Sequence, residues 1–126
     1  MAKPKGITVK GVRETEQAFE KLRDDIGDMS AVYERVMRNR IPGVRDLTPI
    51  LSGTLRDSWD ALGSTESGSI ISKVSYAPFV EYGAPSRSVA PVGMVHRTLV
   101  AEQKATEQEI KKAIEDLAKK RGFRVD

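Results

Sequence analysis

Apolar residues recur at helical spacing in two segments of the N-terminal third. The first segment covers residues 13–26, and Gly27 follows it at a position that suits a left-handed helix end. In the second segment Ser30 is a candidate N-cap, and the apolar stripe comprises Tyr33, Val36, Met37, Ile41, Val44 and Leu47. Pro42 interrupts this stripe, and a proline inside a helix costs about 3 kcal/mol, so we expect a kink or a break near Ile41.

Alternating apolar and polar residues predict strands in two other regions. Residues 7–10 alternate over a short length that is typical of an edge strand. Residues 48–62 are ambiguous, because their apolar positions fit one face of a helix or one face of a strand. We favour a capped turn from Ser52 to Leu55 that leads into a strand. The polar connection 63–68 and the alternating segment 69–76 complete a predicted hairpin.

The C-terminal region predicts one long helix. Pro91 suits the first helical position, and no proline follows it up to Arg121. The apolar seam is strong at both ends of this segment, whereas Gln103 and Thr106 occupy it in the middle. Either the last turns reach a neighbouring subunit or the helix bends or frays. The whole chain is therefore expected to be one α+β domain, residues 1–126, with a small antiparallel sheet flanked by N-terminal helices and a long C-terminal helix.

One stretch does not fit a core element. Residues 76–91, YAPFVEYGAPSRSVAP, hold three of the seven aromatic residues and three prolines. Pro78 can start a single helical turn that Gly83 ends, and the spacing of three then aligns Tyr76, Phe79 and Tyr82 along one side. These aromatics either cover the core of their own chain or present a docking surface. Residues 83–91 are expected to form an extended arm.

Composition limits the partners that such a surface can have. The 126 residues are 39% hydrophobic and 31% charged, and no apolar run approaches the roughly 18 residues of a membrane span. The chain has no cysteine, which excludes disulfides and thiolate metal sites, and no secretory signal is visible at its start, so we expect synthesis in a cytoplasm. The net charge of +3 comes from mixed signs along the chain, which is not typical of a dedicated DNA reader.

Catalytic, metal-binding and cofactor-binding patterns are missing from the sequence. The single histidine, His96, cannot form a zinc site without further ligands, and a surface or capping role is expected for it. Asp57 and Asp60 would face one side only on a helix. Nucleophile elbows and glycine-rich phosphate loops do not occur. We therefore expect no enzyme activity, no cofactor and no metal.

Three segments in order resemble one protein family. They are TPILSGTLRDSW (48–59), YAPFVEYGAPS (76–86) and VAPVGMVHRTL (89–99), and together they resemble the tail-completion or neck proteins of long-tailed bacteriophages. The matching positions are Pro49, Gly53, Leu55, Ser58, Tyr76, Ala77, Val80, Glu81, Gly83 and Pro91. Ser52 and Thr54 depart from the usual Thr and Arg, and VGMVHRTL replaces a Phe-Leu-Arg-Pro-Ala signature.

The resemblance implies a structural virion protein. Such a subunit would form a homo-oligomeric ring, of six or twelve copies, that joins the DNA-filled head to the tail and contacts neighbouring connector and tail proteins. DNA would pass through the lumen without sequence-specific binding. The residues expected at the subunit or partner interface are Tyr76, Phe79, Val80, Glu81, Tyr82, Arg87 and Arg56. In particular, Glu81 is expected to pair with Arg87 or Arg56 of the adjacent subunit. The alternatives are a tail terminator that caps the tail tube and a nucleic-acid-binding protein.

Overall fold

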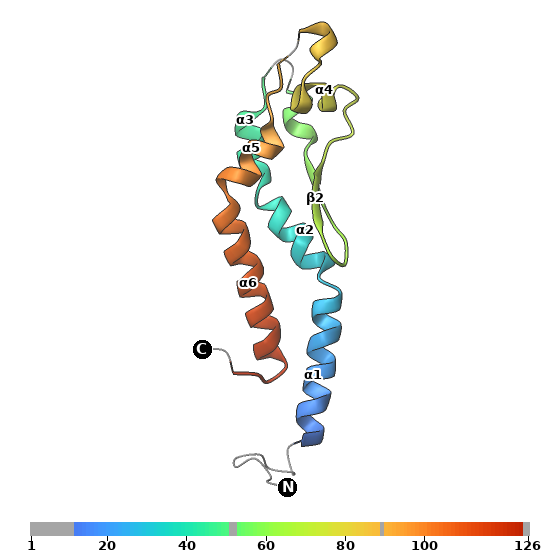
Figure 1. The fold of residues 1–126 in the computed structure, drawn as a ribbon, viewed down its shortest axis with the longest axis vertical. Coiled ribbons are helices and arrows are strands. Elements are labelled where there is room, and N and C mark those ends of the chain that lie inside the picture. Colours follow the sequence, from blue (N-terminus) through green and yellow to red (C-terminus); the bar gives the residue numbers. More distant parts are fainter. Residues whose placement is uncertain (1–11, 51–52, 89, 125–126) are drawn as a thin grey trace.

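The computed structural model describes residues 12–50, 53–88 and 90–124, so the strand expected at residues 7–10 lies outside it. The molecule is elongated, with helix α4 near one end and the start of α1 and the end of α6 at the other (Figure 1). A two-stranded sheet and helices that precede and follow it confirm the predicted α+β class. The elements are α1 (Val12–Gly27), α2 (Ser30–Arg38), α3 (Ile41–Leu47), η2 (Arg56–Ser58), β1 (Asp60–Gly63), β2 (Gly68–Ile71), α4 (Ala77–Tyr82), η3 (Pro85–Arg87), α5 (Met94–Ala101) and α6 (Gln103–Lys120).

The N-terminal helices confirm the periodicity, but their ends differ from the prediction. Gly27 is the last residue of α1 and does not adopt the left-handed conformation. Ser30 is the first residue of α2 and makes no capping hydrogen bond from the N-cap position, which Met29 occupies. Instead, one carboxylate oxygen of Asp28 accepts hydrogen bonds from the Ser30 amide (3.2 Å) and the Ser30 hydroxyl (2.7 Å).

The break near Ile41 is confirmed. Helix α2 ends at Arg38, and α3 begins at Ile41 with Pro42 in its first turn. A proline in the first turn removes no intrahelical hydrogen bond, because those amides have no partner in any helix. The chain therefore restarts its helix at the proline and changes direction there.

The hairpin is also confirmed, but its second strand ends at Ile71 rather than continuing to residue 76. The ambiguous segment 48–62 is divided between two structures. A 3-10 turn, η2, precedes β1, and β1 pairs antiparallel with β2 from Asp60 opposite Ile71 to Gly63 opposite Gly68. The predicted cap at Ser52 lies outside the described residues. The hairpin packs along α2, and both of its end glycines are needed there: a Cβ on Gly68 would lie 2.6 Å from Cγ of Met37, and one on Gly63 would overlap the Ser30 carbonyl oxygen.

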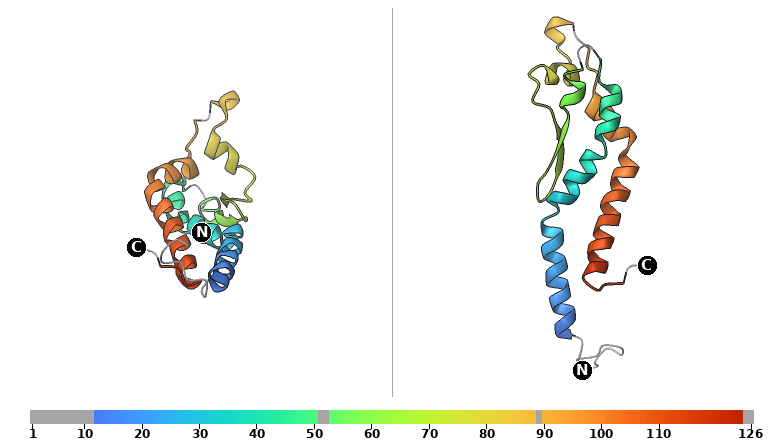
Figure 2. Two further views of the ribbon diagram at one scale, coloured as in Figure 1. Left: turned by 60° about the horizontal axis from the view of Figure 1, so that its bottom comes forward. Right: turned by 180° about the vertical axis from the view of Figure 1, so that it is seen from behind.

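A long C-terminal helix is confirmed as α6, but the segment predicted as one helix forms two, in agreement with the alternative that it bends. Pro91 precedes the helix, and α5 begins at Met94 after Gly93, which has a positive φ of 66°. At Glu102 the backbone departs from helical geometry, and α6 follows in a different direction (Figures 1 and 2). The segment therefore bends, and each part has its own partners: α5 packs on α3 and α4, whereas α6 packs on α2 and α1.

A buried arginine joins the two breaks in the helices. The guanidinium of Arg40, at the junction of α2 and α3, lies 3.1 Å from the Thr106 hydroxyl and 3.5 Å from a carboxylate oxygen of Glu102. It also forms an ion pair with Glu109. The other carboxylate oxygen of Glu109 accepts a hydrogen bond of 2.7 Å from the side-chain amide of Asn39. These contacts tie the bend at Glu102 to the bend at the proline.

The main core lies at the α4 end of the molecule. Its buried members are Val44, Leu55, Ala77 and Met94, from α3, the segment before η2, α4 and α5. At the opposite end the contacts between α1 and the end of α6 are fewer: Arg121 donates two hydrogen bonds to Asp25, at 2.6 and 2.9 Å, and the rings of Phe19 and Phe123 lie 4.5 Å apart. The end that carries α4 is thus the better packed one.

Candidate interaction surface

The single helical turn predicted from Pro78 to Gly83 is present as α4. Pro78 lies in the first turn, where its fixed φ favours the helix and its missing amide hydrogen is not needed. Gly83, with a φ of 78°, ends the turn in a conformation that other residues rarely adopt. The sequence therefore fixes both ends of this short helix locally.

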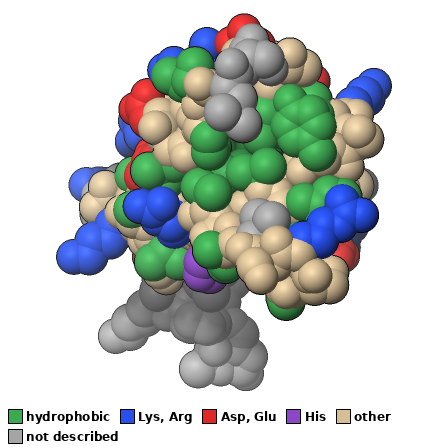
Figure 3. All heavy atoms as spheres, turned by 90° about the horizontal axis from the view of Figure 1, so that it is seen from above, with side chains coloured by type: hydrophobic (Ala, Val, Ile, Leu, Met, Phe, Trp, Pro, Cys, Tyr) green, Lys and Arg blue, Asp and Glu red, His purple; other side chains and the backbone are tan. Residues whose placement is uncertain are grey.

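The aromatic residues of this turn are exposed. Tyr76 is 42% exposed, Phe79 58% and Tyr82 76%, so they do not serve as a cover for the core. Seen from the α4 end, the molecule shows hydrophobic side chains gathered on this face (Figure 3). Contiguous exposed apolar surface on a small protein is a common sign of an interaction site. The surface formed by Tyr76, Phe79 and Tyr82 is the candidate functional site.

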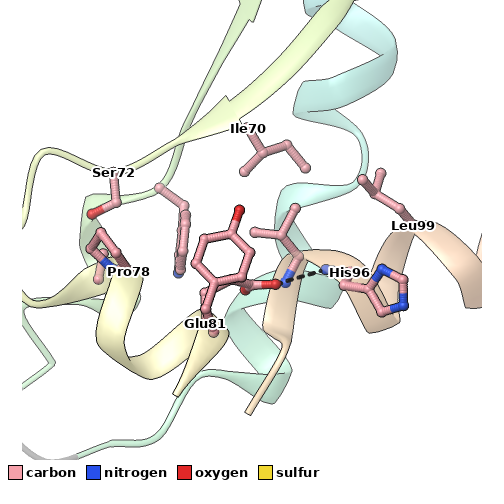
Figure 4. Close-up of a pocket in the computed structure, with 10 residues that line it drawn as sticks. Ile70, Ser72, Pro78, Glu81, His96 and Leu99 are labelled. Carbon is pink, nitrogen blue, oxygen red and sulfur yellow. Dashed lines mark hydrogen bonds between the residues drawn. The ribbon is translucent and has the colours of Figure 1, made fainter. Parts of the chain in front are cut away.

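Glu81 has an intramolecular role that the sequence did not predict. The residue is only 8% exposed, and its carboxylate oxygens accept hydrogen bonds from the amides of Val95 (2.9 Å) and His96 (3.1 Å). These amides lie in the first turn of α5 and have no partner within the helix. A carboxylate at this position also opposes the positive end of the helix dipole. Figure 4 shows the carboxylate pointing at the start of α5.

The backbone fixes α4 against the same region. The carbonyls of Val80 and Glu81 accept hydrogen bonds from the amides of Val92 (2.9 Å) and Gly93 (3.1 Å). The Val80 side chain is half-buried and packs on the core. The exposed aromatics therefore project from a turn that is held on its other side by side-chain and backbone contacts.

An open groove lies beside α4. It has a volume of about 350 Å³ and lies between the hairpin, α4 and α5. Ile70 and Ser72 reach it from the hairpin side, Pro78 and Glu81 from α4, and His96 and Leu99 from α5 (Figure 4). Tyr82 lines this groove and also a second hollow of about 420 Å³ beside Pro91 and Arg97, so it forms a wall between the two.

The two arginines predicted at the interface lie apart from Glu81. Arg87 is exposed in η3, and a side-chain nitrogen of Arg56 lies 4.0 Å from a carboxylate oxygen of Asp46. Within the chain Glu81 forms no ion pair with either arginine, all three residues being among those that the structure describes. An ion pair between Glu81 and an arginine of a second chain stays a prediction, but the burial of Glu81 gives it no support.

The arm 83–91 is not extended throughout. Residues Pro85–Arg87 form the 3-10 turn η3, and Ser88 follows with a left-handed φ of 55°. Ala84 is buried rather than exposed. Proline fixes φ near the value that both extended and 3-10 geometry require, so its presence alone did not distinguish the two.

The acidic residues considered as a catalytic pair have separate structural partners. Asp57 pairs with Arg45 at 3.2 Å, and Asp60 pairs with Arg38 at 3.0 Å. The hydrogen bond from the Ala61 amide, together with the Arg38 contact, lowers the pKa of Asp60. No group of three metal-ligating side chains lies together in the described part of the chain. None of the helices described is both long enough and apolar enough to cross a membrane.

Sequence reasoning missed the groove residues. Trp59 lies between η2 and β1, Ile70 lies in β2 and Leu99 in α5, and their convergence depends on how the hairpin meets α5. Hydrophobic periodicity marked each of them as apolar, but it carries no information about which faces meet.

A comparison of the chain with protein-family models, with curated proteins and with solved structures finds no match.

Proposed function

We propose that the protein is a structural subunit of a ring in the neck of a long-tailed bacteriophage, where it joins the DNA-filled head to the tail. The observation that carries this proposal is the exposed aromatic surface on α4, held rigidly by Glu81 and by the backbone contacts to residues 92 and 93. Aromatic side chains give a large contact area with few rotatable bonds, and interfaces between proteins are enriched in them.

The energetics favour repeated contacts over one strong contact. Covering a large apolar side chain in full is worth about 1.5–3 kcal/mol, and these side chains are already partly covered. A single copy of the surface thus gives a modest gain, whereas a closed ring repeats the same contact once for each subunit. Contacts that are individually modest therefore favour a closed ring over an isolated pair of subunits.

The sequence supports the same proposal in two ways. Its three motif segments follow the order found in tail-completion and neck proteins, and the residues that carry them build α4, the turn before β1 and the start of α5. The mixed charges along the chain suit a wall past which DNA slides, because many phosphate contacts would hold it.

The test uses particles assembled from a genome that encodes this chain. A stop codon early in the gene is expected to give filled heads and separate tails, and mass spectrometry of intact particles is expected to detect the protein. Electron microscopy of labelled particles should place it at the junction of head and tail. Complete infectious particles made without the protein would overturn the proposal.

A surface variant tests the role of α4 in the same system. Phe79→Glu is expected to lower the yield of joined particles by at least about tenfold, because a charge would then need to be desolvated in each subunit contact. The matched control is Val100→Glu on α5, since Val100 is an apolar residue at a nearly equal exposure of 60%. An equal loss with both variants would contradict a specific role for the α4 surface.

A further inference from the structure

Two of the three exposed aromatics, Tyr76 and Phe79, lie on a different side of α4 from the groove, whereas Tyr82 lines it. Ala77, Pro78 and Glu81 line the groove, and successive residues of a helix are about 100° apart, so these three positions share one side. By the same spacing Phe79, together with Tyr76 at the N-cap position, lies on the other side. One chain thus carries a protruding aromatic pair, Tyr76 and Phe79, and a recess that faces a different direction.

The recess suits an uncharged, apolar occupant. Its walls are mainly apolar, with Trp59, Ile70, Val95 and Leu99 among them. Its one carboxylate, Glu81, is 8% exposed and already accepts two amide hydrogen bonds, so it presents little charge to a partner. Tyr76 and Phe79 carry no charge, so the protruding pair and the recess match in electrostatic character as well as in apolarity. This match within one sequence points to a second copy of the chain as the occupant.

We propose that Phe79 of one copy, flanked by Tyr76, inserts into the groove of the next copy. This inference rests on the proposed ring and names the contact that builds it. Because the protruding pair and the groove occupy different faces, the contact is head-to-tail rather than symmetric, and each subunit uses both faces. A head-to-tail contact generates a ring when its rotation closes and a filament when it does not.

The contact area is small for an isolated pair of subunits. At their exposed fractions Tyr76 and Phe79 offer about 200 Å² together, since a full aromatic side chain offers roughly 200 Å². A stable pair of proteins buries about 800 Å² on each partner. One inserted pair is thus insufficient for a tight dimer, whereas a subunit in a ring buries both its aromatic pair and its groove.

Engineered cysteines provide the test, because the chain has none of its own. Ser75→Cys places a thiol beside the aromatic pair while it keeps Tyr76 and Phe79, and His96→Cys places one at the rim of the groove. The two variants are mixed at high concentration and oxidised. The mixed disulfide dimer is expected to form at least about tenfold faster than a dimer of either variant alone, since only the mixed pair is held at high effective concentration.

Variants of Phe79 show whether the aromatic ring is responsible. In the Ser75→Cys chain, Phe79→Glu is expected to abolish the mixed disulfide, and Phe79→Tyr is expected to keep it. Ser64→Cys in the hairpin connection, which is exposed and remote from the groove, serves as the control partner. Three results would overturn the head-to-tail contact. They are equal cross-linking with Ser64→Cys, no cross-linking at all, and a dimer formed mainly by two Ser75→Cys chains.

The same chemistry in assembled particles separates this inference from the proposed function. A chain that carries both Ser75→Cys and His96→Cys is expected to give a ladder of disulfide-linked oligomers from purified particles. If the protein is present in particles and no ladder forms, the contact is wrong while the neck assignment stands. If the protein is missing from particles, both are wrong.

Discussion

Single residues hold the α4 end together through contacts that their chemical types alone do not reveal. Glu81 is an acidic residue between two hydrophobic neighbours, and its burial is explained only by the amides of Val95 and His96. Gly63 is one of several turn-forming residues in the hairpin connection, yet its position is fixed by the approach of the Ser30 carbonyl. Both requirements involve residues distant in sequence.

Removing the Glu81 carboxylate is expected to destabilise the protein. Glu81→Ala leaves two amides of α5 without partners, which costs about 1–3 kcal/mol in the free energy of unfolding. Urea denaturation followed by circular dichroism measures this change. Glu66→Ala, an exposed acidic residue of the hairpin connection, serves as the control and should change stability by less than about 0.5 kcal/mol. An equal effect of the two substitutions would contradict the capping role.

A pair of glycine substitutions tests the fit of the hairpin on α2. Gly63→Ala places a methyl group against the backbone of Ser30, which cannot move as a flexible side chain can, and is expected to cost about 1–3 kcal/mol. Gly27→Ala is the matched control, because nothing lies within 4 Å of its Cβ position. It is expected to raise stability by up to about 1 kcal/mol. Thermal unfolding of both variants decides the matter, and a neutral Gly63→Ala would refute the close approach.

At the scale of elements, the chain changes direction twice within its helices, and Arg40 connects the two places. The proline at the start of α3 explains the first change, but the residues around Glu102 are all compatible with a helix. The second change coincides with the contacts of Arg40 to Glu102, Thr106 and Glu109. A tertiary contact therefore accompanies a bend at a place where local sequence shows only an interrupted apolar seam.

Arg40→Ala is expected to destabilise the protein by about 3 kcal/mol, because it leaves two carboxylates without their shared partner in a partly buried site. Arg45→Ala removes an exposed pair with Asp57 and should cost less than about 1 kcal/mol. Chemical denaturation of both variants gives the comparison. If α5 and α6 keep their bend without Arg40, as judged by the distance between spin labels on the two helices, other contacts hold it.

These cases separate what the sequence could predict from what it could not. Helices α1 and α2, the break at Pro42, the hairpin and the turn at α4 follow from spacing, proline and glycine within a few residues, so local physics was enough. The bend at Glu102 coincides with contacts to Arg40, 62 residues earlier in the chain. The groove depends on Trp59, Ile70 and Leu99 meeting. Contacts of this kind leave no periodic signal.

At the scale of the whole molecule, the two ends differ in how they are held. The α4 end has a continuous core, whereas at the other end the residues after α6 contact α1 through Arg121 with Asp25 and through Phe123 with Phe19. The hydrogen bonds from Arg121 hold the pKa of Asp25 below its ordinary value of 3.8. A carboxylate whose pKa is lowered by folding stabilises the folded state above its ordinary pKa and loses that contribution as the pH falls through the lowered value.

The contact between α1 and α6 should therefore weaken in acid. From about pH 5 downwards, the melting temperature of the wild type is expected to fall more steeply than that of Asp25→Asn, which has no carboxylate to protonate there. Asp28 and Asp60 also have lowered pKa values, so Asp25→Asn should retain part of the slope. If the melting temperatures of the two proteins fall equally with pH across this range, the Asp25 contact adds nothing to stability.

The unequal packing of the two ends has a consequence for motion. Among the described residues, none of those that form the main core comes from α1, so α1 separates from its neighbour at a smaller free-energy cost than the core requires. We therefore expect the amide hydrogens of α1 to exchange for deuterium through local opening. Those of α3 and α5 are expected to exchange only when the entire chain unfolds. The α4 end of the molecule is thus expected to exchange slowly, and the end at which α1 begins is expected to exchange quickly through open states.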